Sequence, residues 1–210
     1  MLRFVVVLTT MLVSFSLHAE APFSFATTPG QLPKTVVPEH YEFNIVPDFD
    51  TLTFRGHESI TIRVVEATDR FVLNVLDIEV QRAQLGGPAL GGENLRAQAR
   101  VDAERQTLSL DFDRTLDPGQ YELVLDYTGV IGPQAQGLYY DRYPAPDGSE
   151  KLLLGTQMEP TDARRLLPCW DEPVFRASFE MSVDIPERFS AYSNMPVANT
   201  ETLDGGLKRV

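Results

Sequence analysis

Apolar and polar residues alternate one by one over several long stretches of this chain, and this pattern constrains its fold more than any other feature. Successive side chains of a β-strand point to opposite faces, so each stretch predicts a strand with one buried and one solvated face. The apolar members of the predicted strands are Tyr41, Phe43 and Ile45; Ile60, Ile62 and Val64; Leu108, Leu110 and Phe112; Tyr121, Leu123, Leu125 and Tyr127; and Phe179, Met181, Val183 and Ile185.

Turn-forming residues separate these stretches, and long segments with helical periodicity are scarce. Strands joined by such turns favour an all-β fold, either an antiparallel sandwich or a saddle-shaped domain. One short helix is predicted over 161–166, with Thr161 as its N-cap and Pro168 beyond its end. The turn signals are Pro47-Asp48-Phe49-Asp50, Gly86-Gly87-Pro88, Gly91-Gly92, Asp117-Pro118-Gly119 and Asp204-Gly205-Gly206.

The chain is predicted to contain three parts. Residues 1–19 have the features of a secretory signal, since Arg3 precedes a mostly apolar run and Ala19 offers a small residue for cleavage. The alternative is that this run is a buried N-terminal strand or helix. We expect an exported protein, periplasmic or secreted, in which a proline-rich, linker-like segment (20–37) leads into a β domain (38–210).

The chain ends at 207–210 in what looks like a strand that has just begun after a Gly-Gly turn. A strand cut off at this point would leave an unpaired sheet edge, which complete domains avoid because such an edge promotes aggregation. We therefore expect the β domain to be incomplete at its C-terminal edge.

The charge balance and the single cysteine exclude several kinds of protein. Without 1–19, the chain holds 17 basic and 30 acidic residues, a net charge of −13. Nucleic-acid binding requires clustered Lys and Arg, so no nucleic-acid partner is expected. Only three lysines are present, too few for a basic stripe facing anionic lipid. Cys169 has no cysteine to pair with and no histidine nearby in sequence, and we expect a buried, unreactive thiol.

The histidines do not form a zinc-binding motif. Zinc peptidases of the His-Glu-x-x-His class place two histidines one helical turn apart, with a glutamate as general base. The nearest match begins at His57 and Glu58, but Thr61 stands where the second ligand belongs. It also lies on a strand pattern, where residues four apart are separated by roughly 13 Å. We expect this chain to bind no metal.

A dense run of polar, charged and turn-forming residues, 155–173, interrupts the alternation, and we call it the signature segment. It reads Gly-Thr-Gln-Met-Glu-Pro-Thr-Asp-Ala-Arg-Arg-Leu-Leu-Pro-Cys-Trp-Asp-Glu-Pro. Buried polar groups need partners. An ion-pair and capping network is therefore predicted for the charged residues Asp162, Arg164, Arg165, Asp171 and Glu172. Judged by alternation alone, Gln157 and Glu159 would lie on the solvated face of a strand.

The signature segment resembles the corresponding segment of zinc aminopeptidases of the aminopeptidase N type, which are gluzincins. Trp170 stands where that family more often has Phe. The resemblance spans about residues 33 to 210 and is supported by Val37-Pro38-Glu39-His40-Tyr41, Phe54-Arg55-Gly56 and Gly137-Leu138-Tyr139-Tyr140.

The resemblance implies roles for two residues. Gln157 would line the pocket for the first substrate side chain, and Glu159 would accept hydrogen bonds from the α-ammonium group of a peptide. It also implies zinc in the parent enzyme, bound by a His-Glu-x-x-His motif that this sequence lacks. A second anchoring motif of the family, Gly-x-Met-Glu-Asn, is also absent from it.

The predicted function is therefore that of an N-terminal fragment of an exported zinc aminopeptidase, inactive alone. It would form one wall of an active site completed by the catalytic domain of the same parent chain, and its substrates would be peptides with a free N-terminus. One alternative is a stand-alone secreted β-sandwich that serves as a binding or scaffold module. Another is an adaptor like the lipid-handling relatives that share this domain. The fragment hypothesis predicts a reading frame that continues past Val210 into both missing motifs.

Overall fold

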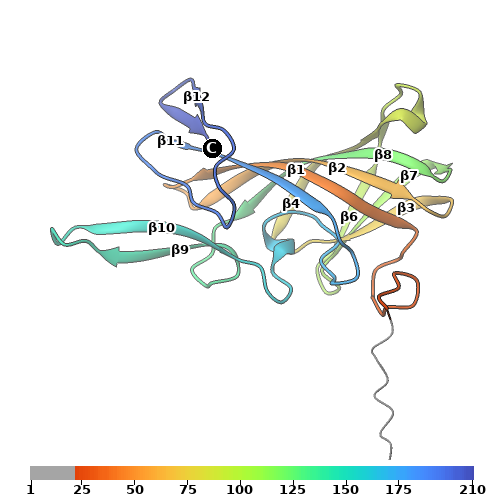
Figure 1. Ribbon diagram of the computed structural model, residues 1–210, viewed down its shortest axis with the longest axis horizontal. Coiled ribbons are helices and arrows are strands. Elements are labelled where there is room, and N and C mark those ends of the chain that lie inside the picture. Colours follow the sequence, from red (N-terminus) through yellow and green to blue (C-terminus); the bar gives the residue numbers. More distant parts are fainter. Residues whose placement is uncertain (1–21) are drawn as a thin grey trace, which may run out of the picture.

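Residues 22–210 are described by the computed structural model, and they form a molecule built almost entirely of β-strands (Figure 1). The predicted signal segment lies outside these residues. In chain order the elements are β1 (Val36–Asp48), β2 (Thr53–Val64), β3 (Thr68–Asn74), β4 (Ile78–Gly86), the 3-10 helix η1 (Pro88–Leu90), β5 (Leu95–Arg96), β6 (Gln98–Asp102), β7 (Thr107–Leu116), β8 (Gly119–Val130), β9 (Gly137–Pro144), β10 (Glu150–Gln157), the 3-10 helix η2 (Ala163–Arg165), β11 (Ser178–Pro186), β12 (Glu201–Leu203) and β13 (Leu207–Arg209).

An eight-stranded sheet forms the long layer of the molecule, in the order β12-β13-β11-β1-β2-β8-β4-β5. Its neighbouring strands are antiparallel, except that β1 and β11 run parallel. A parallel pair cannot be joined by a tight turn. Residues 49–177, which include the signature segment, connect these two strands. The predicted antiparallel all-β fold is confirmed.

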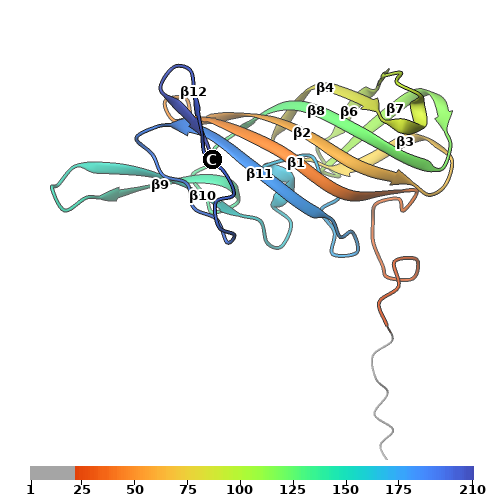
Figure 2. The ribbon, with the colours of Figure 1, turned by 45° about the horizontal axis from the view of Figure 1, so that its top comes forward.

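A three-stranded sheet, β3-β7-β6, covers one end of the eight-stranded sheet, on the right in Figures 1 and 2. The two sheets share one hydrophobic core, and the predicted inner faces of β1, β2, β7 and β8 are buried in it. The β9–β10 hairpin projects at the opposite end. The largest fully buried side chains are Tyr41, Tyr127, Phe54, Phe71, Ile60, Ile62, Leu73, Leu85, Leu108, Leu110, Leu116 and Leu123.

Three predicted boundaries can be compared with the structure. The first strand begins at Val36, so the last two residues of the linker-like segment already belong to β1. The strand predicted after the Gly-Gly turn is present as β13, which pairs with both β11 and β12. The helix predicted over 161–166 is wrong in extent: it is the single 3-10 turn η2, and no side chain caps it. No helix within residues 22–210 is long and apolar enough to cross a membrane.

The predicted burial of β11 is wrong for its first half. Phe179 and Met181 face the same side of the sheet as their partners Tyr41 and Phe43, and the Phe179 ring stacks on Tyr41 with centroids 4.8 Å apart. Yet Phe179 is 62% exposed and Met181 is 48% exposed. Within residues 22–210, these two side chains therefore lie on the inner side of the sheet without a second layer that buries them.

Gly56 allows an aromatic ring to lie directly on the backbone of β2. It is paired with Tyr127 of β8, and a Cβ atom at position 56 would stand 2.1 Å from the Tyr127 ring. Tyr127 is itself fully buried, so its ring has no free space into which it could move. Glycine is therefore required by packing at this position, and its backbone conformation is not the reason.

Gly56→Ala is expected to lower the free energy of unfolding by about 1–3 kcal/mol, because an added methyl group would overpack the core against Tyr127. Urea titration of both proteins measures the difference. Gly132→Ala is the matched control, since the nearest atom to an added Cβ there lies 4.0 Å away. Equal losses in the two variants would contradict this account of Gly56.

Candidate functional site

Gln157 and Glu159 lie where the β9–β10 hairpin joins the sandwich. Gln157 is the last residue of β10 and is paired with Gly137 of β9. Glu159 follows in the adjoining turn, and both side chains are exposed. The Gln157 amide nitrogen donates to the backbone oxygen of Glu159 at 3.5 Å. The structure thus brings the two predicted substrate-binding residues together on one short stretch of backbone.

The carboxylate of Glu159 differs from the other charged groups of the signature segment. Within residues 22–210 it makes no hydrogen bond and no ion pair with another side chain. The neighbouring charged residues Asp162, Arg164, Arg165 and Asp171 all form ion pairs. Glu159 therefore keeps its acceptor oxygens available to a group from outside these residues.

Arg165 ties the turn that carries Glu159 to the body of the domain. The turn is closed by the Asp162 backbone N–H, which donates to Met158 O at 2.8 Å. Arg165 Nε donates to the Asp162 carboxylate at 2.9 Å, and its Nη1 donates to the carboxylate of Asp77 in the β3–β4 connection. It also packs against Gly137, where an added Cβ would stand 2.5 Å from the Cβ of Arg165. One arginine thus links both predicted binding residues to the sandwich.

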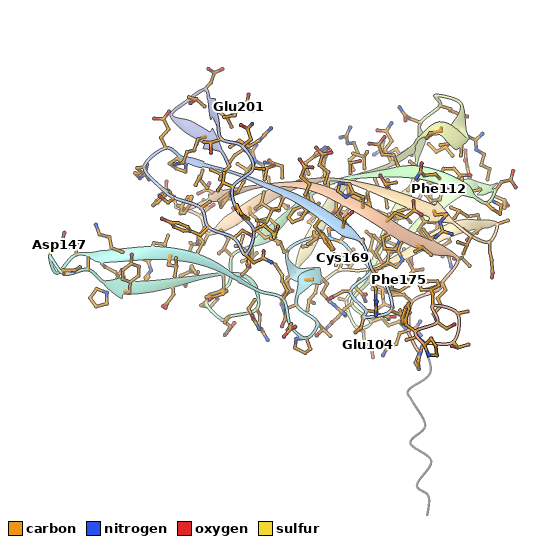
Figure 3. The ribbon with its side chains drawn as sticks, viewed as in Figure 1. Glu104, Phe112, Asp147, Cys169, Phe175 and Glu201 are labelled. Atoms are coloured by element: carbon orange, nitrogen blue, oxygen red, sulfur yellow. The ribbon has the colours of Figure 1, made fainter. Side chains whose placement is uncertain are left out.

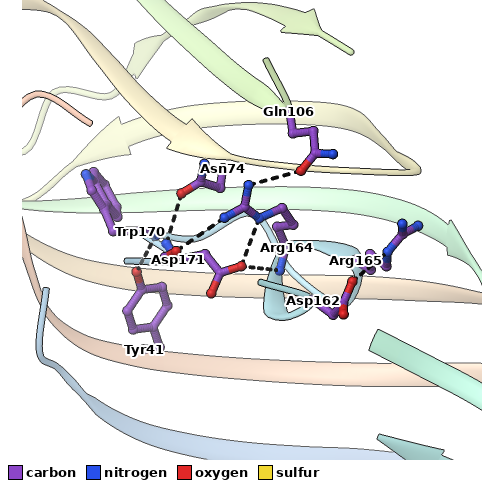
Figure 4. A network of polar contacts seen from close by, with 8 residues as sticks. All are labelled: Tyr41, Asn74, Gln106, Asp162, Arg164, Arg165, Trp170 and Asp171. Atoms are coloured by element: carbon purple, nitrogen blue, oxygen red, sulfur yellow. Dashed lines mark hydrogen bonds and ion pairs between the residues drawn. The ribbon is translucent and has the colours of Figure 1, made fainter. Parts of the chain in front are cut away.

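The predicted ion-pair network of the signature segment is confirmed, and Figure 4 shows its buried part. Arg164 Nε donates to Asp171 at 2.9 Å, and Arg164 Nη1 donates to the side-chain oxygen of Gln106 at 3.1 Å. The Asp171 backbone N–H donates to Asn74 at 3.1 Å. Sequence reasoning missed Asn74 and Gln106, because no local pattern indicates a contact to a side chain so far along the chain.

Glu172 has the predicted capping role, but the backbone N–H groups that it caps lie far away in the sequence. Its carboxylate accepts hydrogen bonds from the backbone N–H groups of Gln31 and Leu32, at 2.9 and 3.0 Å. The signature segment therefore also holds in place the chain that leads into β1.

The prediction of a buried thiol is confirmed too: Cys169 lies in the interior (Figure 3), and burial raises the pKa of its thiol well above the ordinary value.

The described residues do not fit a zinc ion. Within 22–210, no three His, Cys, Asp or Glu side chains gather closely enough to hold a metal. His57 Nδ1 lies 2.6 Å from Asp126 on the solvated face of the sheet, and that carboxylate also pairs with Arg82. Glu58 points to the opposite face and is buried. The two adjacent side chains therefore cannot share a ligand.

Glu58 is a second feature that sequence reasoning missed. In the sequence, Glu58 stands out only as part of an incomplete metal motif, but its side chain is fully buried, and burial raises its pKa well above the ordinary value. The available signal was the alternation itself. Glu58 stands at even spacing from Ile60 and Ile62, so it shares their buried face.

Five large apolar side chains remain exposed between residues 179 and 197. They belong to β11 and to the loop between β11 and β12, and that loop lies next to the base of the β9–β10 hairpin in both Figures 1 and 2. Within the described residues nothing covers them, and we call them the uncovered apolar face. Its members are Phe179, Met181, Tyr192, Met195 and Val197.

Comparison with known proteins finds one family along nearly the whole β domain. The family model of the peptidase M1 N-terminal domain matches residues 37–210. Aminopeptidase N of Acetobacter pasteurianus is 38% identical over 213 residues, which cover 100% of this chain and 58% of that protein. Aminopeptidase M1-C of Oryza sativa subsp. japonica is 36% identical over 86% of this chain, and Aminopeptidase 2 of Candida albicans is 37% identical over 85%. The chain spans only 20% and 19% of the latter two.

Proposed function

The chain belongs to the family of peptidase M1 N-terminal domains, and on that premise we propose that it forms one wall of the active site of an exported zinc aminopeptidase. In this proposal Glu159 binds the α-ammonium group of a peptide, and Gln157 lines the pocket for the first side chain. The similar proteins carry the name aminopeptidase, which supports the reaction class. The catalytic domain of the same parent chain would complete the site.

The observation that carries this proposal is the unpaired carboxylate of Glu159 on a braced turn. An enzyme that removes one residue at a time must recognise the amino end of its substrate at a fixed distance from the first peptide bond. A carboxylate held on a closed turn provides such a reference point. Hydrogen bonds to a charged group contribute about 1.5–3 kcal/mol, which corresponds to a discrimination of about ten- to 150-fold.

The zinc of such an enzyme would have to be bound outside the described residues, since they do not fit it. When bound, zinc would polarise the first peptide carbonyl and activate a water molecule. The part assigned to this chain is to hold and orient the amino end of the peptide. It needs only the acceptor oxygens of Glu159 and the amide of Gln157.

We further propose that the uncovered apolar face packs against the catalytic domain. Phe179 and Met181 continue the inward-facing rows of the sandwich core. They are therefore apolar side chains of the kind found in a core, available for contact with another domain. Large exposed apolar patches mark interaction surfaces. The relatives that the chain matches are longer than this chain, so they contain further residues that could form a domain packed on this face.

Phe179→Ser is expected to change the unfolding free energy of the isolated chain by less than about 1 kcal/mol, because its side chain is already mostly in water. In the full-length enzyme the same change is expected to cost about 2–4 kcal/mol, since the side chain would there be buried. Unfolding of both forms measures this contrast. Phe112→Ser, in the β7 core, is the control that should destabilise both. Equal effects of Phe179→Ser in the two forms would refute the proposed interface.

The isolated 210-residue chain is expected to hydrolyse no aminoacyl substrate and to bind no stoichiometric zinc. Aminoacyl-p-nitroanilide assays and metal analysis of the purified chain test this, with the full-length enzyme as the positive control. The full-length enzyme should also prefer a free amino end to an acetylated one. Turnover by the isolated chain, or equal cleavage of free and acetylated substrates by the full-length enzyme, would count against the proposal.

A further inference from the structure

A carboxyl group lies in the core of the sandwich without a partner. Glu58 stands in the middle of β2, between Phe43 of β1 and Leu125 of β8, and its exposure is 0%. Among the described residues neither of its oxygens has a hydrogen-bond partner, and the hydroxyl of the nearby Tyr127 has none either. Burying an unpaired carboxylate is so costly that such a group takes up a proton instead.

The groups that face Glu58 offer no compensating charge. Tyr41 faces it from β1, Tyr127 from β8 and Cys169 from the signature segment, and burial raises the pKa of each. A negative charge on Glu58 would raise these three pKa values further. Beyond Cys169 stand Arg164 and Asp171, which neutralise each other at 2.9 Å. No cation is therefore left to pair with an ionised Glu58 from this side.

The signature segment closes over this carboxyl group. The Trp170 backbone N–H donates to the hydroxyl of Tyr41 at 3.2 Å, a contact drawn in Figure 4. Cys169 exchanges backbone hydrogen bonds with Asn74 at the end of β3, at 2.7 and 3.1 Å. Residues 168–170 are thus held from β1 on one side and from β3 on the other, directly beside the groups that face Glu58.

We propose that Glu58 is a pH-sensitive latch beneath the signature segment. In its neutral form it lets residues 168–170 close over the core. When it gives up its proton to the solvent, the carboxylate must be hydrated, and water reaches it by separating Trp170 from Tyr41. The latch is closed in acid and opens as the pH rises, and it does not depend on the proposed peptidase function.

The direction follows from the difference between the folded and unfolded states. Burial raises the pKa of Glu58 in the folded state above its ordinary value of 4.5. The stabilisation that protonated Glu58 gives the folded state is therefore fully present below about pH 4.5. It is lost as the pH rises toward the pKa of Glu58 in the folded state. Over this range, closing the segment requires the uptake of one proton, so the closing equilibrium constant falls about tenfold per pH unit.

Amide hydrogen exchange at Trp170 tests the latch in the 210-residue chain. Trp170 is the only tryptophan, so selective labelling identifies its amide. Above about pH 5, its protection factor, corrected for the intrinsic exchange rate, is expected to fall by up to about tenfold per pH unit in the wild type as the pH rises toward the folded-state pKa of Glu58. The decline should be absent in Glu58→Gln. Glu42→Gln, an exposed residue on the neighbouring strand β1, should behave as the wild type.

Two results would overturn the proposal. One is the same pH dependence at Trp170 in the wild type and in Glu58→Gln. The other is a fall in protection at the core residue Ile60 as steep as the fall at Trp170, which would mean that the whole domain opens. If Glu58→Gln does not fold, Glu58→Leu removes the titrating group and supplies an apolar side chain. It must flatten the pH dependence in the same way.

Discussion

Glu159→Gln in the full-length enzyme is expected to lower kcat/KM for peptides with a free amino end by about ten- to 150-fold. The substitution keeps the size of the side chain but removes the charge that would pair with the α-ammonium group. Nothing in the described domain should change otherwise, because the Glu159 carboxylate has no partner within residues 22–210. Steady-state kinetics with an aminoacyl-p-nitroanilide measures the loss.

The variant Glu66→Gln serves as the control, because this exposed residue in the β2–β3 connection lies outside the signature segment. It should leave kcat/KM unchanged. The acetylated substrate provides a second comparison, since it has no ammonium group for Glu159 to bind. If Glu159→Gln slowed free and acetylated substrates equally, the proposed role in amino-end recognition would be lost, even though an effect on activity had been found.

Arg164→Met is expected to lower the unfolding free energy of the isolated chain by about 3–5 kcal/mol. The side chains of Arg164 and Asp171 are only 10% and 13% exposed, so removing the arginine leaves a nearly buried carboxylate without its partner. The same change also removes the donor to Gln106 and the donor to the Asp171 backbone oxygen. Urea unfolding followed by circular dichroism measures the loss.

Arg105→Met is the matched control for this prediction. Arg105 pairs with Asp102 at 3.8 Å, but the two side chains are 82% and 51% exposed. Exposed ion pairs of this kind contribute about 0–1 kcal/mol. A loss of that small size for Arg164→Met as well would show that the buried pair does not hold the signature segment in place.

The strand faces could be predicted in advance because they depend only on local geometry. The rows led by Tyr41, Ile60, Leu108 and Tyr121 are buried as their alternation indicates. The turns at Asp117-Pro118-Gly119 and Asp204-Gly205-Gly206 separate β7 from β8 and β12 from β13. Both features follow from the two-residue period of a strand and from the turn preferences of Gly, Pro and Asp.

Other features of the site depend on contacts that no local pattern reveals. Gln106 accepts a hydrogen bond from Arg164 across 58 positions, and Glu172 caps backbone N–H groups across 140. The predicted N-cap at Thr161 failed for a related reason. The segment makes only a single 3-10 turn, and the Asp162 carboxylate pairs with Arg165. The partners in these contacts are determined by how the strands pack against one another.

For the five strands predicted from alternation, the amino-acid sequence alone determined which side of the strand each residue faces, and its turn signals marked where several strands are separated. It also singled out the signature segment as the part rich in polar groups that need partners. Only the tertiary structure decided whether an inward-facing side chain is covered: Phe179 and Glu58 both face inward, yet one is 62% exposed and the other 0%. The reason is physical, because alternation sets the direction of a side chain, whereas burial depends on whether a second layer of distant residues lies opposite it.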